Sequence, residues 1–153
     1  MKRIKITTIL VIALLSASLD AKSASHYYYS KTISGSLDEV TMQVKEVLKE
    51  QGFGIVSEMD MHKTLNEKVE GANVKPYRLL GACNPKFAYD VIQKEGNIGL
   101  FLPCKVLLKE KAGNEIEVVM VNPTVMIDIV DNPELDGIAD EVTKRFEKAI
   151  KNL

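Results

Sequence analysis

Three helix-start signals divide the chain and constrain its fold more than any other feature. Ser36-Leu37-Asp38-Glu39 is a capping box, and both Asn84-Pro85 and Asn132-Pro133 place a capping side chain before a proline at the first helical position. β-branched and aromatic residues gather between these signals, a composition typical of strands. A chain that alternates strands with capped helices is expected to form an α+β domain.

The predicted order of elements is βαβαβαββα. We expect strands at 26–34, 53–57, 77–83, 98–108 and 116–120. Helices are expected from the Ser36 cap to Gly52, from an Asp60 cap to Gly71, from Asn84 to Gly96, and from Asn132 onward. The apolar stretch 125–130 has no pattern that assigns it. The order predicts a two-layer α+β sandwich, in which helices cover one mixed sheet of about five strands.

The N-terminus reads as an export signal. Lys2, Arg3 and Lys5 form a basic start, and the 14 residues from Ile6 to Leu19 carry no charge. That length suits a signal-peptide core and falls short of the roughly 20 residues that span a bilayer. We therefore predict a signal peptide at 1–21, cleaved after Ala21, a single domain at 22–153, and an exported protein, periplasmic or secreted. The alternative is a retained N-terminal anchor helix.

Size and charge exclude several classes of protein. A chain of 153 residues holds one domain. The formal net charge is −1, and loss of Lys2, Arg3, Lys5 and Asp20 with the signal leaves 17 basic and 20 acidic side chains, a net charge of −3. A mildly acidic domain lacks the positive surface that nucleic acids or anionic membranes require. We expect no nucleic-acid partner and no stable membrane span after signal cleavage.

Two cysteines carry the chemical possibilities of the sequence. Cys83 immediately precedes Asn84 and Pro85, where the N-terminus of a helix would favour a thiolate. Cys104 follows Pro103, and a proline inside a strand suggests an edge position or a bulge. If the third and fourth strands are parallel neighbours, the two cysteines lie at a similar height. Core packing, a disulfide or redox pair, and thiolate ligation of a metal or haem all remain open.

Other chemical motifs are weak. Only His26 and His62 could serve a cysteine nucleophile as a base, and neither has a recognisable partner, so we lean against an enzyme. Met59 and His62 lie in a Met-Asp-Met-His run whose thioether and imidazole groups would suit copper. We favour a structural role for them. The sequence has no glycine-rich phosphate loop and no Ser-centred nucleophile elbow.

Paired motifs carry a family resemblance. The run YRLLGACNP at 77–85 and the run IGLFLPC at 98–104, with GFG at 52–54, VNP at 121–123 and NPEL at 132–135, resemble the domain of unknown function 302 family. The resemblance covers roughly residues 34–150. It implies a small two-layer α+β domain and a homodimer, and it implies no activity.

These observations lead to one functional prediction and two alternatives. We predict a non-catalytic exported binding module whose site, near Cys83 and Cys104, holds a small ligand, a metal or haem. Asn84, Pro85 and Pro103 would fix the two thiols in place. The alternatives are a thiol-disulfide redox protein and a structural or partner-binding homodimer.

Overall fold

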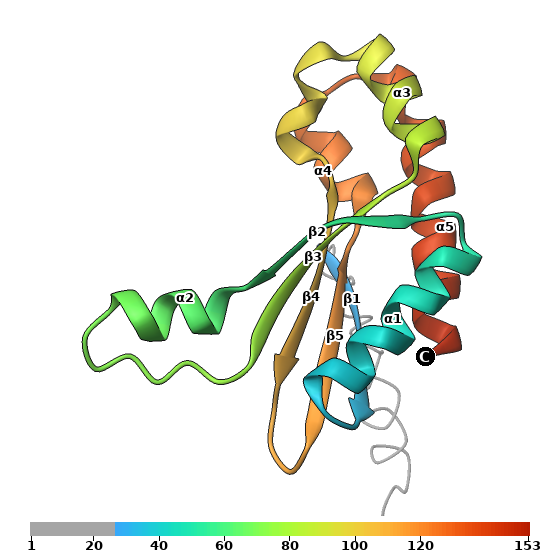
Figure 1. Ribbon diagram of the computed structural model, residues 1–153. Helices are drawn as coiled ribbons and strands as arrows, with labels where there is room; N and C mark the ends of the chain where they lie inside the picture. Colours follow the sequence, from blue (N-terminus) through green and yellow to red (C-terminus); the bar gives the residue numbers. More distant parts are fainter. Residues whose placement is uncertain (1–26) are drawn as a thin grey trace, which may run out of the picture.

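One five-stranded sheet organises the protein (Figure 1). The computed structural model describes residues 27–153, so the predicted signal peptide at 1–21 and His26 lie outside the described residues. The strands are β1 (Tyr28–Ser34), β2 (Gly54–Asp60), β3 (Tyr77–Cys83), β4 (Cys104–Glu110) and β5 (Glu115–Val121), and their order across the sheet is β1-β5-β4-β3-β2. The predicted α+β class and the number of strands are confirmed.

The helices follow the predicted sequence signals closely. They are α1 (Leu37–Glu50), α2 (Met61–Lys68), α3 (Pro85–Lys94), α4 (Pro123–Val130) and α5 (Asp136–Asn152), with short 3-10 helices η2 (Gly96–Phe101) and η3 (Pro133–Leu135). The predicted capping box is present: the Ser36 hydroxyl accepts from the Glu39 N–H, and the Glu39 carboxylate accepts from the Ser36 N–H at 2.9 Å. Within residues 27–153, none of the helices combines the length and apolar character needed to cross a bilayer.

The prediction of a mixed sheet is wrong, because all four strand pairs are antiparallel. The error lies in the segment between β3 and β4. Parallel neighbours would need a crossover that carries the chain back to the start of β3. Instead α3 and η2 stay at the end of the sheet where β3 finishes, and β4 starts from that same end, with Ala82 paired to Cys104.

The predicted fourth strand begins too early. Residues 96–101 form η2, whose first turn is capped by the Glu95 carboxylate, and β4 begins only at Cys104. Pro103, which has no N–H for a strand ladder, separates the two segments. Pro103 therefore stands before β4 and not inside it. The edge position inferred from that proline is wrong, because β4 is the central strand of the sheet.

Two further differences concern α2 and α4. Asp60 precedes α2 as predicted, yet its side chain makes no capping hydrogen bond, and no residue of α2 is buried. In Figure 1, α2 projects away from the sheet beyond β2. The unassigned stretch 125–130 belongs to α4, which Asn122 caps by accepting from the Thr124 N–H at 3.2 Å.

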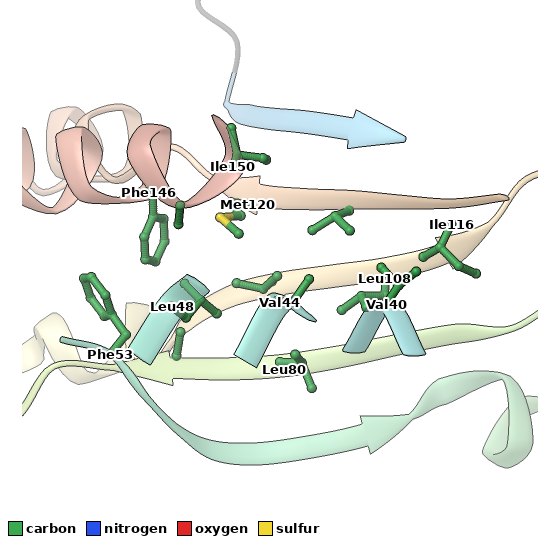
Figure 2. Packing of buried hydrophobic residues seen from close by; sticks show 14 of the residues in the cluster. Val40, Val44, Leu48, Phe53, Leu80, Leu108, Ile116, Met120, Phe146 and Ile150 are labelled. Carbon is green, nitrogen blue, oxygen red and sulfur yellow. The ribbon is translucent and has the colours of Figure 1, made fainter. Parts of the chain in front are cut away.

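The main core lies between the sheet and two helices. Figure 2 shows side chains of α1 and α5 packed against those of β3, β4 and β5. Fully buried members include Leu48, Leu80, Leu108, Met120 and Phe146. A second, smaller cluster of Val91, Ile98, Ile127, Leu135 and Ala139 joins α3, η2, α4, η3 and α5. We call the part of the molecule formed by α3, η2 and α4 the tip.

Candidate functional site

A largely apolar cavity of about 70 Å³ lies where the tip meets the sheet. We call it the tip cavity. Phe53, Ala82, Cys83 and Cys104 line it from the sheet side. The helices contribute the remaining side chains, among them Phe87, Val91, Phe101, Met126, Ile127 and Val142. The cavity therefore sits between the two core clusters, and its walls come from segments far apart in the sequence.

Cys83 and Asn84 are held in the wall by the start of α3. The Asn84 carboxamide oxygen accepts from the N–H groups of Lys86 (3.0 Å) and Phe87 (3.2 Å), which caps the helix. Its amide nitrogen donates to the carbonyl of Gly52 at 2.9 Å. Gly52 has φ +83, a conformation that favours glycine. This bond connects the Gly-Phe-Gly run at 52–54 to the Asn84 motif through Gly52.

Cys104 reaches the same cavity from the first residue of β4. Ala82 pairs with Cys104, so Cys83 is one residue along β3 from the residue opposite Cys104. Burial, with a smaller contribution from the charge of Cys83, raises the pKa of the Cys104 thiol from 9.0 to about 11. Cys104 is therefore a neutral thiol at pH 7. Both cysteines are free thiols in the structure.

The structure brings together only part of the predicted site. Cys83, Asn84 and Cys104 line the tip cavity, whereas Pro85 and Pro103 are not among its lining residues. Pro85 is exposed at the first turn of α3. Pro103 instead packs over Gly81, where it would meet any added Cβ atom.

Met59 and His62 lie away from the cysteines. Met59 pairs with Leu79 of β3, four residues before Cys83, which corresponds to about 13 Å along a strand. Nδ1 of His62 accepts from the N–H of Tyr77, the first residue of β3, at 3.2 Å. The structure thus does not unite the Met59–His62 run with the thiols, and the copper motif and the cysteine pair are separate features.

The most informative residue that the sequence prediction missed is Met126. It lines the tip cavity from α4, the helix that had no predicted assignment. The signal was available, because Asn122-Pro123 has the same cap-then-proline pattern as Asn84-Pro85. At Asn122-Pro123 this pattern predicts the start of α4, and it makes the apolar residues of that helix candidates for the cavity wall.

The lining residues limit what the tip cavity can bind. None of them carries an ionised carboxylate or an imidazole, and the polar atoms of Asn84 make hydrogen bonds within the protein. No group of three or more His, Cys, Asp or Glu side chains suited to a metal occurs within residues 27–153. Pockets that enclose drug-sized ligands measure roughly 300–1,000 Å³. A cavity of about 70 Å³ is much smaller than such pockets, so it suits an ion or a very small molecule better than haem.

A polar cleft of about 370 Å³ lies at the other end of the sheet, beside the buried Arg78. Arg78 donates to both carboxylate oxygens of Asp60 (2.6 and 3.2 Å), to Asp38 (2.8 Å) and to the hydroxyl of Thr41 (3.2 Å). The hydrogen bond from Arg78 holds the pKa of Asp60 well below its usual range. Because all three guanidinium nitrogens are engaged, we interpret this cluster as a structural tie between β3, β2 and α1.

Comparisons with known proteins agree with the fold. The family model described as "Domain of unknown function DUF302" matches residues 29–153. A crystal structure of an uncharacterized conserved protein DUF302 from Bacillus stearothermophilus is similar, with 26% sequence identity and a TM-score of 0.77. The similarity covers 84% of this chain and 98% of that one. No curated protein matches. The chain therefore belongs to the family of the domain of unknown function DUF302.

Proposed function

We propose that the protein is a non-catalytic binding module whose site is the tip cavity. The observation that carries this proposal is the composition of the cavity wall. It is apolar throughout, except for two free thiols and one asparagine that caps a helix. Such a wall favours a small uncharged or thiol-seeking ligand, since an ion with a tightly held water shell would lose its hydration without a compensating partner.

The absence of a base for the thiols supports binding over catalysis. No histidine or carboxylate side chain lines the tip cavity. A half-buried, neutral thiol such as Cys104 is a poor nucleophile, because the thiolate is the reactive form. We therefore assign the two cysteines to ligand contact.

Xenon tests whether the tip cavity admits a ligand. We expect xenon to shift the methyl NMR signals of Ile127 and Val142, which line the cavity. Ala139→Leu or Ala88→Leu should fill the space and abolish these shifts. Ala112→Leu, at an exposed turn, is the matched control and should leave them intact. Shifts that survive both filling variants, or no shifts in the wild type, would overturn the proposal.

Assembly into a homodimer is a second proposal, and one face of the sheet supports it. Met59, Leu79, Leu107, Val119 and Ser30 form a cross-strand row through the registers of all five strands. The three central members of the row are only partly buried: Leu79, Leu107 and Val119. They lie on the face opposite to that of their buried neighbours Leu80, Leu108 and Val118. In Figure 1, α1 and α5 lie on the same side of the sheet.

A second copy of this chain suits that face. The apolar row is flanked by Lys109 and Glu117, which form an ion pair at 3.2 Å. A patch that carries both signs of charge around an apolar centre can meet its own copy across a two-fold axis. Analytical ultracentrifugation should show a dimer that Leu107→Glu converts to a folded monomer, while Val56→Glu on exposed β2 leaves it unchanged. A wild-type monomer at all concentrations would refute the dimer.

A thiol-disulfide role is the remaining alternative, and it is supported by the position of both cysteines in the wall of the tip cavity. Oxidised glutathione would supply the oxidant: two thiol hydrogens leave and one S–S bond forms, while glutathione disulfide is reduced to two thiols. Mass spectrometry should then show the loss of two hydrogens from the protein, with no glutathione attached. Two thiols that remain free would dismiss a redox role.

Export also stays a proposal, based on the sequence of residues 1–21. If the signal is removed as we propose, N-terminal sequencing of the protein from its own cells should begin at Lys22. A protein that retains Met1 and remains with the cytoplasmic fraction would contradict export.

A further inference from the structure

Three sulfur-containing residues line the tip cavity. Cys83 comes from the end of β3, Cys104 from the start of β4 and Met126 from α4. They are held by three different elements, so the fold itself, and not a short sequence motif, collects them. From these residues we infer that the tip cavity is a binding site for a soft monovalent metal ion, with Cu(I) as the representative case. This inference rests on the proposed binding function and names its ligand.

The donor set selects the metal. Thiolate and thioether ligands favour soft ions such as Cu(I), whereas Mg²⁺ and Ca²⁺ require oxygen ligands. Structural zinc almost always takes four ligands from Cys, His, Asp or Glu. The tip cavity offers two cysteines and no lining histidine, aspartate or glutamate. A third sulfur from Met126 completes a set that suits Cu(I) and leaves Zn²⁺ short of ligands.

The surroundings suit the charge changes that binding requires. Two S–H protons leave for solvent, two S–Cu bonds form, and the metal keeps its oxidation state, so no electron donor is needed. The complex gains one negative charge. The N-terminus of α3, which begins two residues after Cys83, favours negative charge nearby, and the charge of Lys105 acts in the same direction on Cys104.

The rest of the lining also favours a soft ion. It offers no carboxylate, and the Asn84 carboxamide is already hydrogen-bonded within the protein. A hard ion would therefore lose its water shell without gaining oxygen ligands in return.

Anaerobic titration of the full, reduced chain with Cu(I), in competition with bicinchoninate, tests the inference. We expect one ion per chain. Cys83→Ser and Cys104→Ser should each weaken binding by at least about 100-fold, because loss of an outer-shell partner alone costs 10–100-fold. Met126→Leu, which preserves size, should weaken it by about 10-fold. Met59→Leu is the control and should leave affinity unchanged, because Met59 lies outside the cavity.

X-ray absorption at the copper edge of the wild-type complex keeps the test independent of how the variants fold. Sulfur-only ligation supports the site. Nitrogen or oxygen ligation, or affinity that survives the Cys83→Ser/Cys104→Ser double variant, overturns it. Xenon binding to the metal-free protein separates the proposed binding function from the proposed copper ligand. If the cavity binds xenon but not Cu(I), the binding function stands and the assignment of copper is wrong.

Discussion

Among the glycines of residues 27–153, Gly81 has the closest neighbours. A Cβ atom added there would overlap the Ser57 hydroxyl oxygen and the Pro103 ring. Gly81 pairs with both Ser57 of β2 and Lys105 of β4, so its neighbours on either side are fixed by the sheet. The glycine therefore lets Pro103 fold over β3 directly before Cys104.

Gly81→Ala should lower the free energy of unfolding by about 1–3 kcal/mol, the usual cost of an extra methyl group in a filled site. Urea denaturation measures this. Gly137→Ala is the matched control: it lies in α5 with open space around the added atom, and should be neutral or stabilising by up to about 1 kcal/mol. An equal effect at both sites would show that packing at Gly81 is not the cause.

The raised pKa of Cys104 predicts a dependence of stability on alkaline pH. A thiol whose pKa rises on folding, here from 9.0 to about 11, stabilises the folded state fully below pH 9. That contribution is lost as pH rises from 9 towards 11. Urea unfolding at pH 8 and at pH 10.5 should show this loss in the wild type and a smaller loss in Cys104→Ala. Indistinguishable pH profiles would contradict the buried neutral thiol.

At the scale of elements, Arg78 ties two strands and a helix together. The residue is 8% exposed, and its guanidinium bridges Asp60 at the end of β2 and Asp38 in α1. Arg78→Met removes the main partner of the partly buried Asp60, which keeps Lys63 at 2.6 Å, so stability should fall by about 1.5–3 kcal/mol, the contribution of a hydrogen bond to a charged group. Exposed Lys68, paired with Glu67, is the control, and Lys68→Met should change stability by no more than about 0.5 kcal/mol.

The sign of the pH dependence follows from Asp60. Because Arg78 holds the pKa of Asp60 below its ordinary value of 3.8, the pair stabilises the fold above about pH 4 and loses this effect as pH falls. The wild type should therefore exceed Arg78→Met in stability most at neutral pH, and acid should narrow the gap. A gap that stays constant down to pH 2 would argue for lost packing rather than lost charge pairing.

Local signals predicted the elements well, and long-range geometry much less well. The caps at Ser36, Asn84 and Asn132 are all confirmed by side-chain hydrogen bonds, because a cap is decided by neighbours within three residues. Strand direction depends on where the chain travels between strands, and η2 gave no signal of its own. Residues Ile98, Leu100 and Leu102 alternate like a strand, so their 3-10 path was missed.

The candidate site also combines features that local sequence signals predict with features that depend on tertiary packing. Cys83 and Cys104, which were singled out from the sequence, both line one cavity although the strands run antiparallel instead of parallel. Both strands place a cysteine at the same end of the sheet, one as the strand finishes and the other as it begins. Met126 was missed because the Asn122-Pro123 cap was not used to predict α4, although which apolar residue of α4 reaches the cavity still depends on tertiary packing.

For the whole molecule, the two core clusters predict unequal local stability. Within residues 27–153, the main cluster has fifteen buried residues and the second cluster, at the tip, has five. Regions with few buried apolar contacts open at lower free energy than the core. Native-state hydrogen exchange should show amides of α3 and α4 opening below the global unfolding energy that protects β4 and β5. Uniform protection across both clusters would refute this division.

The position of β1 has a consequence for how the chain is made. Within residues 27–153, β1 pairs only with β5, and each paired residue lies more than 80 positions from its partner, as Ser34 does from Glu115. At roughly 5–20 residues per second, a ribosome needs about 4–16 s to deliver that partner. During this interval the tyrosine-rich β1 has been synthesised but has no strand to join. Of the five strands, β1 is thus synthesised first and is paired only after β5 has been made. A factor that binds the nascent chain could contact unpaired β1 during those seconds.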